Sequence, residues 1–166
     1  QSTGPPPELV KRRDLLLRAA RDAHGKGHFI RARKYFDRAH KILPLDAEDL
    51  QIQQDCDFQL SSLQPQIDKF QEGEYAQILP ILWRKRESAP EDPNIKLLIV
   101  DSYYNLALTD LQRGNPSGAA KKLDEALEVD SGNDDLVRMK LFAETYSKRS
   151  PDLLYRIFVK YLPSRS

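Results

Sequence analysis

The chain has 166 residues, of which 40% are hydrophobic, and its 26 Lys and Arg nearly balance 25 Asp and Glu. A chain of this length is expected to form one domain that buries roughly 70% of its surface on folding. No apolar run approaches the ~18 residues that span a bilayer, and a single cysteine excludes an internal disulfide framework. We therefore expect a cytoplasmic protein without a membrane span.

The charged residues form three blocks of alternating sign. Residues 1–43 contain eleven basic and four acidic side chains, whereas residues 44–145 contain ten basic and twenty acidic ones. The last 21 residues are basic again, with five basic side chains against one acidic. Such blocks steer the encounter with a charged partner or with a second copy of the chain, or they are simply solvated helix faces.

The N-terminal region predicts a linker followed by two helices. Residues 1–7 contain three prolines, which favour an extended linker that we expect to connect to further sequence upstream. A first helix is predicted from about Glu8 to His24. A second is predicted between Gly27 and Pro44, because apolar residues recur there at spacings of three and four. These residues are Phe29, Ala32, Phe36 and Ala39.

This predicted helix pair resembles a tetratricopeptide repeat (TPR), a helix–turn–helix unit of about 34 residues. The residues that carry the resemblance are Gly27, Phe29, Ala32, Phe36, Ala39 and Pro44. The resemblance implies an α-solenoid, in which stacked helix pairs form a concave surface that binds a segment of another protein. It implies a binding module and leaves the partner open.

The second predicted pair is longer than the family unit. Its glycine turn, at Gly73, lies 46 residues after the first. We interpret the extra length as one long helix from about Ala47 to Gln71, which Pro65 should kink or divide. The returning helix is predicted from Tyr75 to about Ser88 and contains an internal proline, Pro80. The second repeat is therefore predicted to be distorted.

The remaining sequence predicts a more faithful repeat and a divergent final pair. Asp92 opens a helix that reaches about Arg113, and its partner follows a turn at Gly114. Another helix is predicted from Asp134 to Ser147. The last helix is expected to begin after Ser150, with this serine as its N-cap.

Together these elements predict an all-α fold, a TPR-like α-solenoid of about four antiparallel helix pairs over residues 8–166, with the second pair distorted. In this family the first helices of successive pairs line the concave groove. The positions that match are Leu17, Arg21, Leu63, Ile67, Phe70, Asp101, Tyr104 and Leu108. Apolar residues at these positions equally suit the core of a distorted superhelix. Some members clamp a terminal carboxylate with basic groove residues, but Leu17 and Asp101 occupy two of those positions, so we do not expect such a clamp.

The last predicted helix is apolar on almost every side. Eight of the twelve residues from Pro151 to Leu162 are apolar, and a helix of this kind is normally covered. The cover is a partner, a second copy of the chain or the chain's own groove, unless the helix is a cap with partly exposed tyrosines. We predict Tyr155, Val159 and Leu162 as contact residues, with a homodimer through residues 151–162 as the alternative.

Three further features bear on function. Trp83 precedes Arg84, Lys85 and Arg86, a combination typical of binding hot spots, although a lone tryptophan is more often structural. The basic first helix pair makes nucleic-acid binding an alternative, which is disfavoured because its cations surround two helices and the middle of the chain is acidic. No metal-binding, nucleophile or phosphate-loop motif occurs. We therefore expect a protein–protein interaction module, of scaffold or signalling type, with no enzymatic activity, metal or cofactor.

Overall fold

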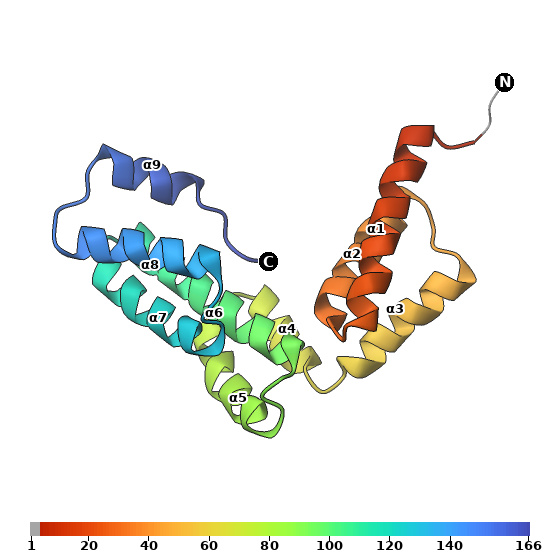
Figure 1. The fold of residues 1–166 in the computed structure, drawn as a ribbon, viewed down its shortest axis with the longest axis horizontal. Helices are drawn as coiled ribbons and strands as arrows, with labels where there is room; N and C mark the ends of the chain where they lie inside the picture. The colour runs from red at the N-terminus through yellow and green to blue at the C-terminus, as the bar shows by residue number, and fades with distance from the viewer. Residues whose placement is uncertain (1–3) are drawn as a thin grey trace. The chain divides into compact units, whose positions relative to one another are not determined.

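The computed structural model describes residues 4–166, and these residues form nine helices and no strand, which confirms the expected all-α fold (Figure 1). The chain divides into two compact units between Gln64 and Pro65. The first unit contains α1 (Pro7–Gly25), α2 (Phe29–Ile42) and α3 (Ala47–Gln59). The remaining helices are α4 (Gln64–Gln71), α5 (Tyr75–Ser88), α6 (Pro93–Gln112), α7 (Pro116–Val129), α8 (Asp134–Ser147) and α9 (Leu153–Tyr161). Residues 1–3 of the predicted linker lie outside the described residues, and its last residue, Pro7, begins α1.

The core of the first unit consists of small side chains around one aromatic ring. Phe36 and Ala32 of α2 are fully buried, together with Ala20 of α1 and Cys56 of α3. Because alanine side chains are short, neighbouring helices approach closely on either side of the Phe36 ring. Burial raises the pKa of the Cys56 thiol to about 11, so it stays protonated and unreactive at neutral pH.

The same turn ends α1, α4 and α6. In each case a glycine has a positive φ, which is 78° at Gly27, 82° at Gly73 and 74° at Gly114. The N–H of the next residue donates to the carbonyl five residues earlier, at 2.9, 2.9 and 2.8 Å respectively. This is the Schellman helix ending, in which glycine occupies the left-handed position. The three predicted glycine turns are therefore confirmed.

We expect the substitution Gly73→Ala to destabilise the protein by about 1 kcal/mol, because a Cβ is strained at this φ. A Cβ at Gly73 would meet no heavy atom within 4 Å, so the backbone conformation is the sole source of the effect. Gly132→Ala is the matched control, since it has the same open space without a positive φ. Urea unfolding followed by fluorescence of the single tryptophan, Trp83, measures both variants. Equal stability of the two variants would contradict the prediction.

The predicted long helix from Ala47 to Gln71 is divided in two, and residues 60–63 form the turn between α3 and α4. Pro65 is the second residue of α4, where a proline has no helical hydrogen bond to lose. In one continuous helix its ring would clash with the carbonyl four residues earlier. Instead the N–H of Leu63 donates to the carbonyl of Leu60 at 2.9 Å. Of the two expected effects of this proline, a kink or a division, the structure shows the division.

Side-chain caps start several helices, and one predicted cap is wrong. Asp92 accepts hydrogen bonds from two backbone N–H groups at the start of α6, as predicted. Ser150 does not cap α9, because this helix starts at Leu153 and the carboxylate of Asp152 accepts the N–H of Tyr155 at 2.9 Å. The hydroxyl of Tyr146 donates to the same carboxylate at 2.7 Å and so holds it in the capping position. A carboxylate there also complements the helix dipole.

In the second unit consecutive helices from α5 to α8 pack side by side, and α6 is the most buried of them. The helix α5 continues through Pro80. On α7 the predicted stripe of Ala119, Leu123 and Ala126 is fully buried. After α8 the chain folds back, so that α9 packs against α6 and lies alongside α8 (Figure 1). One face of α9 therefore lies against α6 and α8, and the opposite face points away from them.

Candidate interaction surfaces

Three of the predicted groove residues belong to the first unit, and each has an internal role. Leu17 and Leu63 are buried, Leu17 within the core cluster. The guanidinium of Arg21 donates two hydrogen bonds to Asp49, from Nε to Oδ1 at 2.9 Å and from Nη2 to Oδ2 at 2.7 Å. Leu17 and Leu63 therefore serve the interior of the unit, whereas the side chain of Arg21 is half-exposed while it binds Asp49.

Two ion pairs and one histidine–carboxylate contact join the basic α1 and α2 to the acidic α3. The ion pairs are Arg21–Asp49 (2.7 Å) and Arg33–Asp57 (3.2 Å), and Nε2 of His24 lies 2.6 Å from a carboxylate oxygen of Asp55. The hydrogen bonds that Arg21 donates to Asp49 are the main reason why the pKa of Arg21 is raised. Residues 1–64 contain eleven basic and nine acidic side chains, so the unit as a whole is nearly neutral. Much of the positive charge that would attract a polyanion is thus already compensated.

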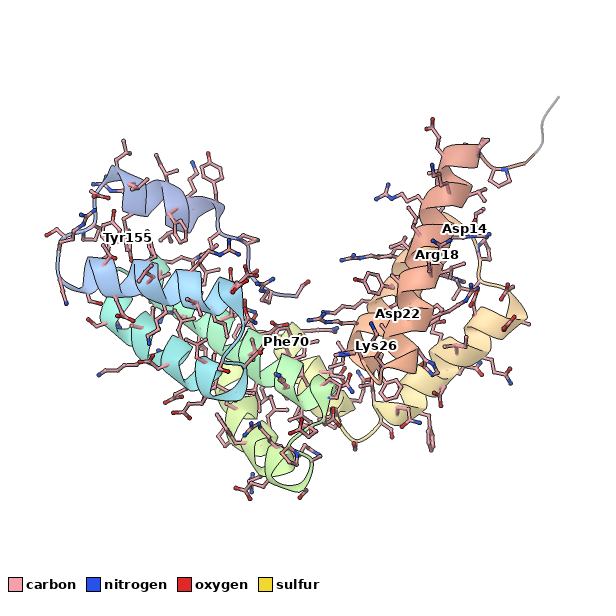
Figure 2. The ribbon with its side chains drawn as sticks, in the orientation of Figure 1. Asp14, Arg18, Asp22, Lys26, Phe70 and Tyr155 are labelled. Atoms are coloured by element: carbon pink, nitrogen blue, oxygen red, sulfur yellow. The ribbon has the colours of Figure 1, made fainter. Side chains whose placement is uncertain are left out.

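The outer face of α1 shows the same mixture of charges. Figure 2 shows Asp14, Arg18, Asp22 and Lys26 following one another along this helix at four-residue spacing. Lys26 lies 3.1 Å from Asp22. Because acidic and basic side chains alternate, this face is not a continuous cationic stripe of the kind that follows a phosphate backbone. Nucleic-acid binding stays the disfavoured alternative.

The predicted groove residues of the second unit are also largely internal. Ile67, Phe70 and Leu108 are buried, and the ring of Phe70 meets that of Tyr75 edge-on at 5.0 Å between centroids. Asp101, on α6, is only half-buried. Tyr104 is also buried and lies four residues before Leu108 on α6, and the guanidinium of Arg165 lies over its ring. A partner contact at Ile67 and Phe70 stays a prediction.

Trp83 ties α5 to α6. Its indole Nε1 donates to the hydroxyl of Tyr103 at 2.8 Å, and the two rings meet edge-on at 6.5 Å. The guanidinium of Arg86 lies 5.6 Å from the indole centroid. Burial raises the pKa of Tyr103 to about 12, so its hydroxyl is protonated at physiological pH. Trp83 is half-buried, and these contacts give it a structural role beside the predicted one in binding.

The inner face of α9 is held by an aromatic cluster. Phe142 of α8 stacks on Phe158 at 4.0 Å between centroids and on Tyr155 at 5.4 Å. Tyr155 lies between α9 and α8 (Figure 2), and its hydroxyl donates to the carbonyl of Leu111 at the end of α6. Val159 is also buried. The predicted contact residues Tyr155 and Val159 therefore pack against the chain's own helices, and of the expected covers for this face the structure shows α6 and α8.

The opposite face of α9 is exposed and apolar. We name it the outer α9 face, and it consists of Leu153, Leu154, Ile157 and Tyr161, which are between 47% and 72% exposed. Leu153, Ile157 and Tyr161 are four residues apart, so their side chains lie along one side of the helix. The described part of the chain has ten exposed large hydrophobic side chains, and four of them lie on α9. Because α9 has only nine residues, exposed apolar side chains are denser on this helix than in the rest of the described chain.

The segment after α9 binds back to α6 and α8 through Arg165. The side chain of Asn105 makes two hydrogen bonds with the backbone of Arg165. Its Nδ2 donates to the Arg165 carbonyl at 2.8 Å, and its Oδ1 accepts the Arg165 N–H at 2.7 Å. The guanidinium lies 4.5 Å from the centroid of the Tyr104 ring, and its Nη2 lies 2.6 Å from Asp135. We name Tyr104, Asn105 and Asp135 the Arg165 site. Sequence analysis identified Tyr104 alone. The one signal that the sequence offered for the rest was a polar residue, Asn105, among the apolar residues of α6.

Within the described residues no group of three or more His, Cys, Asp or Glu side chains is arranged to hold a metal ion. None of the described helices combines the length and apolar character needed to cross a bilayer. Comparisons of the chain with models of known protein families, with curated proteins and with solved structures each found no match.

Proposed function

We propose that the chain is a TPR-like protein-interaction module, cytoplasmic and of scaffold or signalling type, whose outer α9 face binds an amphipathic helix of a partner protein. The observation that carries the proposal is the concentration of exposed Leu, Ile and Tyr side chains on this face. Contiguous apolar surface of this kind marks interaction sites in soluble proteins. A helix of a partner that buries its own apolar stripe there would remove both surfaces from water.

The charges beside the face favour an acidic partner. Arg156 and Lys160 are exposed on α9 and border the apolar stripe. The last 21 residues of the chain carry five basic side chains and one acidic one. A partner helix flanked by Glu or Asp therefore gains electrostatic attraction during encounter. Two copies of α9 facing each other would bring like charges together, which disfavours the homodimer through residues 151–162.

The test compares two doubly substituted proteins. Proteins captured from a cell extract by the immobilised chain are purified and titrated against it directly. Leu153→Asp with Ile157→Asp should weaken binding by about a hundredfold or more, because each buried aliphatic side chain contributes about 1.5–3 kcal/mol. Val137→Asp with Leu141→Asp is the matched control, since these exposed apolar residues lie on α8. The control should bind like the unaltered chain.

Light scattering separates the proposal from self-association. A monomeric chain that loses its partner through the α9 substitutions supports the proposed function. A chain that is dimeric by itself, and becomes monomeric through the same substitutions, would instead establish the homodimer. Equal partner affinity of the α9 variant and the α8 control would refute a role for the outer α9 face.

A further inference from the structure

The end of the chain occupies a site that has the features of a receptor for an extended peptide. We propose that Tyr104, Asn105 and Asp135 recognise an extended, arginine-containing segment of a partner protein, and that residues 163–166 occupy this site in cis until such a segment replaces them. The site is separate from the outer α9 face, and either proposal can fail without the other.

Asn105 recognises the backbone of the bound segment. Asn105 is 3% exposed in the middle of α6, where a Leu or Ala would pack without the need for a hydrogen-bonding partner. The amide donates to and accepts from the same residue, Arg165, as a neighbouring β-strand would. This pairing requires an extended ligand backbone and is independent of the ligand's side chains. Residues 162–166 belong to no helix, and Leu162, where the segment begins, has extended backbone angles (φ −77°, ψ 116°).

The two other residues select for arginine. The Tyr104 ring provides an aromatic face for a planar guanidinium at 4.5 Å, and Asp135 provides a carboxylate at 2.6 Å. The hydrogen bond from Arg165 is the main reason why the pKa of Asp135 is lowered, so the carboxylate is ionised at neutral pH. A guanidinium satisfies both the ring and the carboxylate at once, whereas the ammonium of lysine is a compact point charge that fits this geometry less well.

The present occupant is attached in a way that permits exchange. Pro163 and Ser164 are exposed, and Leu162, which precedes them, is half-buried. The Arg165 contacts are hydrogen bonds, an ion pair and one aromatic contact at a partly exposed side chain, and residues 163–166 include no large apolar side chain. A partner segment that adds contacts of its own on either side of its arginine would displace residues 163–166. These residues then act as an autoinhibitory ligand that raises the threshold for binding.

The experiment uses a fluorescein-labelled peptide with the sequence of residues 160–166 and the full chain. Deleting residues 163–166 vacates the site, and the labelled peptide should bind this variant at least about tenfold more tightly than the unaltered chain, where the attached segment competes at an effective concentration in the millimolar range. Arg165→Ala keeps the two backbone hydrogen bonds to Asn105 and loses the guanidinium contacts, so it should give a smaller gain. Adding Asn105→Ala or Asp135→Ala to the deletion should abolish binding. A peptide with alanine in place of its arginine should not bind, and one with lysine should bind more weakly.

Fluorescence of Trp83 during urea unfolding checks that each variant retains the folded second unit. Tight, arginine-dependent binding to the protein that lacks residues 163–166 would establish the site as a receptor. Failure of the peptide to bind this folded, vacated protein would overturn the proposal and leave the Arg165 contacts as purely intramolecular ones. Binding that persists after Asn105→Ala, or that ignores the peptide arginine, would equally overturn it.

Discussion

Replacing Arg21 by alanine is expected to lower the free energy of unfolding of the first unit by about 3 kcal/mol. The side chain of Asp49 is 1% exposed, and Arg21 donates both of the hydrogen bonds that hold its two oxygens. Removing one partner of a buried ion pair leaves an uncompensated charge, which costs about 3–5 kcal/mol. We expect the lower end of this range, because Arg21 is half-exposed and water can enter where its side chain was.

The converse substitution is expected to be milder. In Asp49→Ala the guanidinium of Arg21 can turn to solvent, so the loss is that of the hydrogen bonds, about 1–2 kcal/mol. The double variant Arg21→Ala with Asp49→Ala should therefore be more stable than Arg21→Ala alone, since it contains no buried charge. Equal effects of the two single substitutions would show that Asp49 is not an isolated buried charge after all.

Cysteine labelling provides the measurement for these variants. Cys56 is fully buried in the first unit and is the only cysteine, so its reaction with a thiol reagent in urea reports the opening of that unit. The single tryptophan, Trp83, lies in the second unit and reports separately on it. The comparison distinguishes a loss confined to α1–α3 from a loss throughout the chain.

Local signals explain why much of the fold could be predicted from the sequence. The Schellman ending at Gly27 requires a glycine at one position and involves residues at most five apart. The cap at Asp92 and the bounds of α5 and α8 likewise follow from neighbouring residues. Pro65 illustrates the limit of such signals, because the steric rule allowed a kink or a division and the choice depends on how the flanking segments pack.

The candidate site depended on pairings between distant residues, and these could not be predicted. Asp49 was an ordinary first-turn carboxylate in the sequence, and its pairing with Arg21 joins positions 28 residues apart. Arg165 and Asn105 are 60 residues apart, and they meet because the chain reverses after α8. Periodicity assigned Tyr155 to an apolar helix without distinguishing its inner face from its outer one. That distinction requires knowledge of what the helix packs against.

The substitution Tyr155→Ala is expected to detach α9 from the second unit. Truncation of a buried aromatic side chain costs about 3–5 kcal/mol, and here it also removes the hydrogen bond to the carbonyl of Leu111 and the stacking on Phe142. The remaining anchors of the inner face, Phe158 and Val159, lie on a helix of nine residues, which is too short to persist without packing. Loss of α9 would also loosen the segment that carries Arg165.

Limited proteolysis measures this detachment directly. Trypsin cleaves after Arg156 and Lys160, and cleavage within a helix requires local opening. Each 1.4 kcal/mol of lost stability raises the open population tenfold. A loss of about 3 kcal/mol, the lower end of the expected range, should therefore raise the cleavage rate at these two bonds by about a hundredfold. Tyr161→Ala is the matched control, since it removes the same side chain from the outer α9 face, where it is 72% exposed. If both variants are cleaved at the rate of the unaltered chain, the aromatic cluster is not what holds α9 in place.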